Sequence, residues 1–330
     1  MTVSLNNRND LVEPAARLLR SAIDTGDGGT EPQRQFLGLI IDRIWERPDL
    51  DIDSLPPLTP IEAASMFDDE IAKRRLRMMM VPLEMFRAPM TDEQVALVDG
   101  FALALGGDNE GLQLMRELMK GDTERALEHL NAAWALGREQ ISDSTIRARY
   151  EEMDTKIEDP ELAAEMRRLR ELPRGSLGRE YIEFYIANDF NIPGEGVPNP
   201  AFFVAHDMSH LIAGFGPSAP EELALSAFQI GMKDNDAHWM QFLVGLSAYE
   251  IGILGGEDFE AKTSLFAREG AMELVLEAFV RGAQCTANYN EAPLLEMAHR
   301  SIRELREEFG VQPPAVPFPA ITEVNEPPTR

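Results

Sequence analysis

The sequence contains few of the residues that are typical of secreted or nucleic-acid-binding proteins. Its one cysteine, Cys285, excludes a disulfide within the chain and suits a reducing cytoplasm. Lys and Arg number 31 against 57 Asp and Glu, which gives a net charge of −26. This charge argues against nucleic acid, whose phosphates need clustered basic side chains, and against broad adsorption to anionic lipid.

Long apolar runs are also scarce. The longest apolar stretch, Trp239–Leu254, is interrupted by Gln241 and Glu250 and is short for a membrane span. It therefore predicts a helix buried in protein. The amino terminus has no basic region followed by an apolar core, so we expect no signal peptide. We predict a cytoplasmic protein and leave open a peripheral association with a membrane surface.

Signals for β-strands are nearly absent, and the remaining pattern favours helices. Leu, Ala, Glu, Arg and Met recur at spacings of three and four residues, whereas alternating β-branched runs and hairpin dipeptides are rare. We therefore predict an all-α fold. Helical periodicity is clearest in four segments: Asp92–Leu105, Glu110–Met119, Thr123–Arg138 and Pro160–Glu171.

The helices are predicted to form two blocks. The charge-rich stretch Ile146–Asp159 separates them, so we predict a helical domain over residues 1–145 and a second over residues 146–310. The last twenty residues, 311–330, contain six prolines and are expected to form an extended tail.

A basic run in the first block, Lys73–Arg77, precedes Met78, Met79 and Met80. Methionine-rich surfaces are adaptable and can bind partners or lipid. Charge runs are more often a solvated face, and methionines often fill a core. We favour this second interpretation.

The most informative segment is His206–His210, which is followed after eleven residues by Glu222. Two histidines four residues apart lie on one face of a helix, about 6 Å apart along its axis. The helix is expected to end at Gly214, and the short Phe215–Pro217 connection makes the next helix its antiparallel neighbour. Glu222 can then approach the histidine pair. Imidazoles and a carboxylate are ligands that divalent metals prefer, so we predict a metal site here.

Two neighbours of these residues have predicted roles. Asp207 points about 100° away from His206 on the helix, and could be a fourth ligand or orient an imidazole. Ser218 and Glu221 fit a capping box in which the Glu221 carboxylate accepts from the Ser218 backbone N–H. Glu221 is then structural, which leaves Glu222 to turn inward.

His238, which lies beside Asp234 and Asp236, is a further candidate ligand or proton carrier. A helix cap at Asp236 with an incidental histidine is the interpretation that we favour. If the protein is an enzyme, Asp207 and His238 are the candidate catalytic residues that move protons.

The ligand motif resembles the signature of the Coq-four family of ubiquinone (coenzyme Q) biosynthesis proteins. In this chain the motif is His206-Asp207, His210 and then Glu222 followed by Leu-Ala-Leu. Other matching features are Leu172–Gly178 with Tyr181 and Phe184, the glycine at position 214, and the closing helix around Glu304–Gly310. The resemblance covers roughly residues 150–310.

By that resemblance, the chain would be all-helical and would bind a divalent metal through His206, Asp207, His210 and Glu222. Zinc is the metal we expect to find, and Fe, Mn or Co suit the same ligands. The substrate would be a polyprenylated ring precursor of ubiquinone, and the reaction oxidative decarboxylation of the ring. Partners would be other biosynthetic proteins at a membrane, and a homo-oligomer remains open. Residues 1–140 lie outside the typical member, and Ala72–Gly106 weakly resembles the TerB-like helical domain of tellurite resistance.

We therefore expect a metal-dependent enzyme that acts on an aromatic or quinone-like, lipidic substrate. One alternative is a metal-dependent hydrolase, although no cluster of phosphate-binding arginines or glycine-rich loop lies near the motif. Another is a non-catalytic lipid-binding or scaffold protein with a structural metal. Structural zinc sites are more often closed by cysteine, and none lies near the motif.

Overall fold

The computed structural model describes residues 9–87, 89–107, 110–119, 125, 158–195, 201–252 and 264–313. Over these residues the chain is helical and contains no strand, which confirms the predicted all-α class. The first block comprises α1 (Asn9–Ala22), α2 (Glu31–Leu39), α3 (Pro60–Met66), α4 (Glu70–Met85), α5 (Asp92–Ala104) and α6 (Glu110–Met119). The second block comprises α9 (Pro160–Arg168), α10 (Leu177–Ala187), α11 (Ala201–Ala213), α12 (Ala219–Met232), α13 (Asp236–Tyr249), α14 (Ala271–Ala283) and α15 (Ile302–Phe309).

Local capping explains several helix starts. At α3, the Thr59 side chain accepts from the Glu62 N–H, the Glu62 carboxylate accepts from the Thr59 N–H, and Pro60 occupies the first turn. The predicted segments Asp92–Leu105, Glu110–Met119 and Pro160–Glu171 correspond to α5, α6 and α9 with the short 3₁₀ turn that follows it. The predicted helix Thr123–Arg138 and the proposed domain boundary lie outside the described residues, apart from residue 125.

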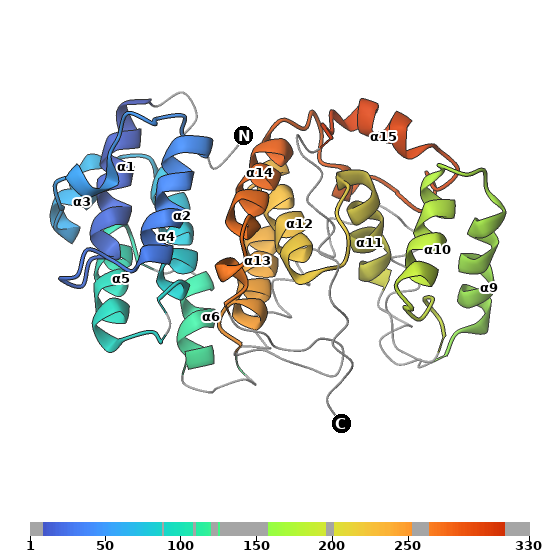
Figure 1. Ribbon diagram of the computed structural model, residues 1–330, viewed down its shortest axis with the longest axis horizontal. Coiled ribbons are helices and arrows are strands. Elements are labelled where there is room, and N and C mark those ends of the chain that lie inside the picture. Colours follow the sequence, from blue (N-terminus) through green and yellow to red (C-terminus); the bar gives the residue numbers. More distant parts are fainter. Residues whose placement is uncertain are drawn as a thin grey trace.

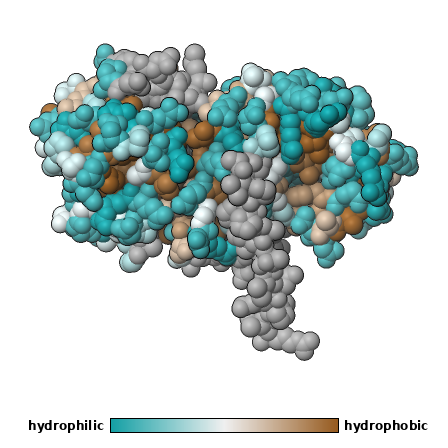
Figure 2. Space-filling model, turned by 45° about the horizontal axis from the view of Figure 1, so that its top comes forward, coloured by the Kyte–Doolittle hydropathy of each residue, from teal (hydrophilic) through white to brown (hydrophobic). Residues whose placement is uncertain are grey.

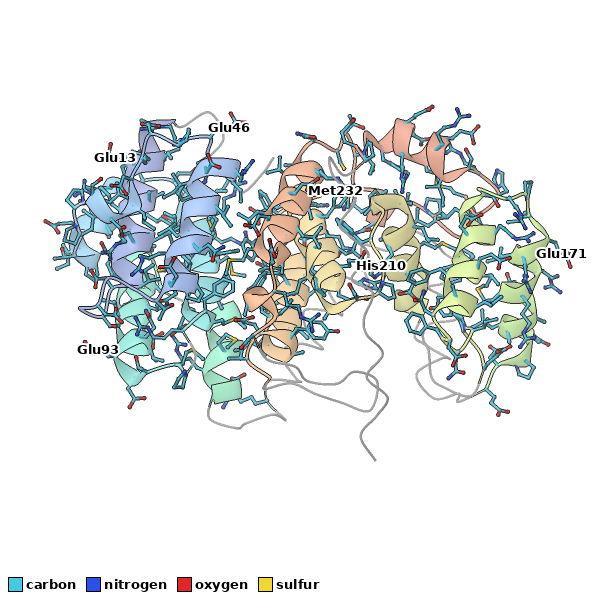
Figure 3. The ribbon with its side chains drawn as sticks, in the orientation of Figure 1. Glu13, Glu46, Glu93, Glu171, His210 and Met232 are labelled. Atoms are coloured by element: carbon cyan, nitrogen blue, oxygen red, sulfur yellow. The ribbon has the colours of Figure 1, made fainter. Side chains whose placement is uncertain are left out.

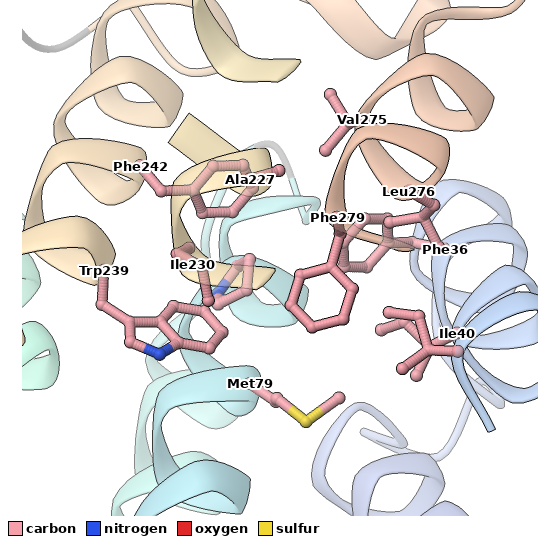
Figure 4. A pocket seen from close by; sticks show the side chains of 12 residues that line it. Phe36, Ile40, Met79, Ala227, Ile230, Trp239, Phe242, Val275, Leu276 and Phe279 are labelled. Atoms are coloured by element: carbon pink, nitrogen blue, oxygen red, sulfur yellow. The ribbon is translucent and has the colours of Figure 1, made fainter. Parts of the chain in front are cut away.

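Helices α12, α13 and α14 lie between the first block and helices α9–α11 (Figure 1). Their apolar side chains join those of the first block in one buried cluster. A small cavity of about 40 Å³ at this junction is lined by apolar side chains from both blocks (Figure 4). A five-residue π-helix, Ile40–Ile44, supplies two of them. The two blocks therefore share a continuous core.

Charged residues also join the blocks. The Arg74 and Arg75 guanidinium groups donate to the Asp234 carboxylate at 3.1 and 2.7 Å, and Arg74 also pairs with Asp236. The Asp234 side chain is 5% exposed. The expectation that this basic run is a solvated face is therefore wrong for Arg74 and Arg75. The adjoining Met78, Met79 and Met80 are buried, as predicted.

Glycines let α12 pack closely against its two neighbours. A Cβ added at Gly231 would overlap the Phe279 carbonyl of α14, and one at Gly282 would overlap the Phe228 carbonyl of α12. A Cβ at Gly245 of α13 would meet the Leu223 side chain at 2.6 Å. The backbone that carries Glu222 is therefore held on two sides.

The visible surface is mostly hydrophilic, with apolar residues showing in scattered patches (Figure 2). Among the described helices, none combines the length and the apolar character that a bilayer crossing requires.

Candidate metal centre

The motif helix α11 ends as predicted, and two arginines fix its end. Gly214 has a φ of 84°, a left-handed conformation that glycine adopts without strain. Arg306 donates to the Ile212 and Leu211 carbonyls at 2.8 and 2.9 Å, and Arg281 donates to the Ala213 carbonyl at 2.6 Å. These bonds satisfy carbonyls that have no partner within the helix. His210, in the last turn, is therefore held in place.

His206, His210 and Glu222 come together between α11 and α12, where Figure 3 places His210. Their candidate ligand atoms all lie within 4.8 Å of one another. The Nε2 atoms of the two histidines are 3.2 Å apart. The His206 Nε2 lies 3.3 Å from Glu222 Oε2, and the His210 Nε2 lies 3.3 Å from Glu222 Oε1. Ligand atoms of a tetrahedral zinc ion are about 3.3 Å apart, because each lies roughly 2.0–2.1 Å from the metal. The three side chains thus fit a divalent metal in both type and spacing.

The electrostatics of the cluster couple its members. Burial alone would raise the pKa of Glu222, but the charge of His210 and hydrogen bonds from both imidazoles hold that pKa well below its usual range. Burial alone would lower the pKa of His210, but the charge of Glu222 and the hydrogen bond to it raise that pKa. The Glu222 carboxylate is therefore an anion placed to attract a cation.

Glu221 has the structural role that was predicted, but through different bonds. Its carboxylate accepts from the Gly216 backbone N–H at 2.8 Å and from the Ser218 hydroxyl at 2.6 Å. The predicted capping box is therefore wrong in detail, because the Ser218 side chain bonds to the carboxylate instead of capping the helix backbone. Glu221 closes the connection between α11 and α12 and leaves Glu222 directed to the histidines.

Asp207 lies beside the three clustered residues and bonds to a neighbouring helix. Its carboxylate accepts a hydrogen bond from the Tyr185 hydroxyl of α10. Burial raises the pKa of Asp207, although the charges of His206 and His210 and the Tyr185 bond oppose this. Its role as a fourth ligand stays a prediction.

Aromatic rings of α10 cover the same side of the cluster. The Phe184 ring stacks on the His210 imidazole at 5.8 Å between ring centroids and 26° between planes. Phe190 packs edge-on against both Phe184 and Tyr185, at 6.0 and 5.9 Å, and is 44% exposed. An apolar, aromatic edge therefore leads from the surface toward the histidine pair.

His238 is buried on α13 and is not one of the three clustered residues, and both of its ring nitrogens have partners. Its Nδ1 donates to the Lys233 carbonyl at 2.8 Å, so its Nε2 accepts from the Asn290 side chain at 3.3 Å. The Asn290 side-chain oxygen accepts from Ser209 of α11 at 3.0 Å. Burial lowers the pKa of His238. Its role as a proton carrier stays a prediction.

The predicted helix cap at Asp236 is wrong. Asn235 caps α13 instead, because its side-chain oxygen accepts from the His238 backbone N–H at 2.9 Å. Asp236 is the first residue of the helix and pairs with Arg74 of the first block.

Gln241 of α13 was not predicted as a site residue, although its side-chain amide nitrogen lies 2.9 Å from His206 Nδ1. Tyr185 and Asn290 were not predicted either. Gln241 follows His206 by 35 positions and lies on another helix, so no local spacing connects them. The one available signal was its polarity, since Gln241 interrupts an otherwise apolar stretch.

Comparisons with known proteins do not assign the chain to a family. No family model matches the sequence, and no curated protein matches it. The chain is similar to a solved structure from Nostoc punctiforme that is described as a "putative ubiquinone biosynthesis protein", with 18% identity and a TM-score of 0.37. The match covers 62% of this chain and 95% of that chain. A similarity of this size carries no argument about function, so the function rests on the site itself.

Proposed function

We propose that the chain binds one divalent metal ion through His206, His210 and Glu222, and acts with it on an aromatic or quinone-like, lipidic substrate. The observation that carries the proposal is the convergence of the three ligand atoms, at separations of 3.2 and 3.3 Å. Two imidazoles and a carboxylate suit zinc and also Fe, Mn or Co.

Three protein ligands leave a coordination position for a substrate or water, which is typical of catalytic rather than structural sites. Asp207 is the residue that would raise the number of protein ligands from three to four. The sequence resemblance implies that Asp207 is the fourth ligand. The alternative is that Asp207 orients an imidazole without binding the metal, and its hydrogen bond to Tyr185 supports this alternative. Structural sites are more often closed by cysteine, and the one cysteine, Cys285, is not in the cluster.

When bound, the metal would polarise a carboxylate or phenolate oxygen of the substrate as a Lewis acid. The protein groups around the metal would bind the ring and the chain of the substrate. Phe184 and Phe190 offer ring faces and edges to an aromatic substrate. Asp207, which accepts a hydrogen bond from the Tyr185 hydroxyl beside the cluster, is the proposed proton carrier.

The resemblance of the ligand motif to ubiquinone-biosynthesis proteins supports a narrower form of the proposal. The substrate would be a ring acid with a prenyl chain. The reaction would be its oxidative decarboxylation, in which a hydroxyl replaces the carboxylate lost as CO₂ and dioxygen is the two-electron oxidant. The partners would be other enzymes of the same synthesis at a membrane surface. The apolar edge formed by Phe184 and Phe190 is compatible with a lipidic substrate that arrives from such a surface.

The test uses protein loaded with Co²⁺, whose visible absorption changes when its ligands change. A hydroxybenzoic acid with a short isoprenoid chain is added, and the same ring and chain without the carboxylate and the hydroxyl serve as the control ligand. We expect the ring acid to shift the spectrum and the control ligand to leave it unchanged. The His206→Ala/His210→Ala double variant should show neither the bound-metal spectrum nor the shift.

Two results would contradict the proposal in different ways. A spectral shift with a phosphate ester, and none with the ring acid, would favour a metal-dependent hydrolase. A cobalt spectrum that responds to neither ligand would favour a structural metal in a lipid-binding or scaffold protein.

A further inference from the structure

Gln241 lies where it can determine which nitrogen of His206 carries a proton. The Gln241 side-chain amide nitrogen is 2.9 Å from His206 Nδ1. On the other side of the ring, His206 Nε2 faces the Glu222 carboxylate at 3.3 Å and the His210 imidazole at 3.2 Å. A neutral imidazole has one N–H, so one of its nitrogens donates while the other accepts. The hydrogen bond made at Nδ1 therefore decides whether Nε2 carries the proton.

The observed orientation of the amide corresponds to the metal-free tautomer. With the amide NH₂ facing the ring, Gln241 donates to Nδ1, and the proton of the neutral His206 must lie on Nε2. There it can donate to Glu222, but Nε2 then has no lone pair for a metal. Metal binding through Nε2 requires the proton on Nδ1, which then needs an acceptor.

Rotation of the amide supplies that acceptor. The nitrogen and oxygen of a glutamine side chain have nearly the same shape, and a half-turn about the last side-chain bond exchanges them. The carbonyl oxygen would then face Nδ1 at the position that the nitrogen now occupies. No shift of α13 or of His206 is required.

We propose that Gln241 is a positioning residue for the metal ligand His206. Its amide donates to Nδ1 when the site is metal-free, and accepts from Nδ1 when Nε2 binds the metal. Histidine ligands commonly donate their second N–H to a carboxylate or a carbonyl, which orients the ring and raises its basicity. Glutamine can both donate and accept, so it stabilises either tautomer. This inference rests on the proposed metal site.

Helix α13 holds Gln241 at a fixed distance from α11. His238 lies one turn before Gln241, and its Nε2 is joined through Asn290 to Ser209 of α11. The His238 Nδ1–H bond to the Lys233 carbonyl fixes the other side of that ring. Gly245, one turn after Gln241, lies against Leu223 of α12. Only the end of the Gln241 side chain has to move when the metal binds.

The experiment measures the affinity of full-length protein for Zn²⁺ by competition with a chelating dye. Gln241→Met keeps the size of the side chain and removes both hydrogen-bonding functions, and Gln241→Glu keeps an acceptor. We expect Gln241→Met to weaken zinc binding about 10- to 100-fold, the usual effect of losing such a partner. We expect Gln241→Glu to bind at least as tightly as wild type, because a carboxylate is an acceptor in every orientation.

Gln229→Met is the matched control. Gln229 of α12 is 3% exposed, and its side-chain oxygen has no hydrogen-bond partner among the described residues. The same exchange there should leave zinc affinity unchanged. A purely structural effect of exchanging a glutamine for methionine inside this helix bundle would instead appear in both methionine variants.

The outcomes separate this inference from the metal site itself. If wild type binds zinc and Gln241→Met binds it equally well, the role of Gln241 is contradicted and the metal site stands. If Gln241→Glu loses as much affinity as Gln241→Met, the accepting role is contradicted. If wild type binds no zinc, both proposals fail.

Discussion

Each block of the molecule contains a cluster of buried polar side chains, and the two clusters differ in what their atoms face. In the first block, the Gln33 amide donates to the Leu83 carbonyl at 2.9 Å and to Gln94 at 3.1 Å. Gln94 donates to the Ala22 carbonyl at 2.6 Å and accepts from Arg87 at 3.1 Å. Donors meet acceptors throughout, so this cluster ties α1, α2, α4 and α5 together.

In the second block, candidate metal-ligand atoms face one another. Two imidazole nitrogens and two carboxylate oxygens converge from His206, His210 and Glu222. Such an arrangement is stable when protons or a cation lie between these atoms. A buried polar cluster whose donors and acceptors satisfy one another maintains a fold, whereas a cluster that converges on a single point has the arrangement expected of the proposed metal site.

Two glutamates, Glu84 and Glu222, make the same contrast. Glu84 of α4 is fully buried, and burial raises its pKa to about 7 even though Arg116 opposes the shift. Glu222 retains 28% exposure, and the histidines hold its pKa well below the usual range. A single arginine does not offset the burial of Glu84, whereas two imidazoles more than offset that of Glu222.

The largest effect is expected from His210→Ala, which removes one of the three proposed ligands. Zinc at about 100 times its Kd should stabilise wild type by about 2.7 kcal/mol, because it binds the folded state. The variant should gain no stability from the same zinc concentration. Thermal unfolding with and without zinc measures this, and equal stabilisation of both proteins would remove His210 from the site.

The matching exchange in the first block is Gln94→Leu. It removes the acceptor of one Gln33 N–H and of the Arg87 Nε–H, and the donor to the Ala22 carbonyl. Each lost bond costs about 1–3 kcal/mol, so we expect a loss of stability on the order of 4 kcal/mol. Urea unfolding measures the loss. Zinc affinity should not change, and a variant that folds normally but binds zinc poorly would contradict the separation of the two clusters.

Glu84→Gln should change how stability depends on pH. The folded pKa of Glu84 is about 7, above the unfolded value of 4.5, so its contribution is complete below about pH 4.5 and is lost as pH rises through 7. The variant should therefore gain up to about 3 kcal/mol relative to wild type between pH 5 and pH 8. Chemical unfolding at both pH values tests this, and parallel pH profiles for the two proteins would contradict the raised pKa.

The smallest effect is expected from Glu221→Gln. Glutamine keeps an acceptor for the Gly216 N–H or the Ser218 hydroxyl, so the loss of stability should be at most about 1 kcal/mol. Zinc affinity should stay at the wild-type value. The adjacent exchange Glu222→Gln is the comparison, because it should weaken zinc binding strongly. Equal losses of affinity in the two variants would show that the two glutamates had been assigned wrongly.

The parts of this structure that the sequence predicts are those with local causes. Thr59 and Glu62 mark a helix start within four residues, and the spacing of His206 and His210 places both on one helix face. Glu222 could be added because the connection between α11 and α12 is short.

The contacts that could not be predicted depend on long-range packing. Asp234 pairs with Arg75, which lies 159 positions earlier in the sequence, so the local pattern of the basic run predicts a solvated face instead. Tyr185 and Gln241 reach the motif from α10 and α13, 22 and 35 positions from their partners. Only the fold brings these helices to the same place.

The most direct test of the central claim is elemental analysis of the full chain, purified without a histidine tag, beside the His206→Ala/His210→Ala variant. The proposed site predicts near one equivalent of a transition metal in wild type and almost none in the variant. Equal metal content in the two proteins, or none in wild type even after zinc is added and the excess removed, would contradict it.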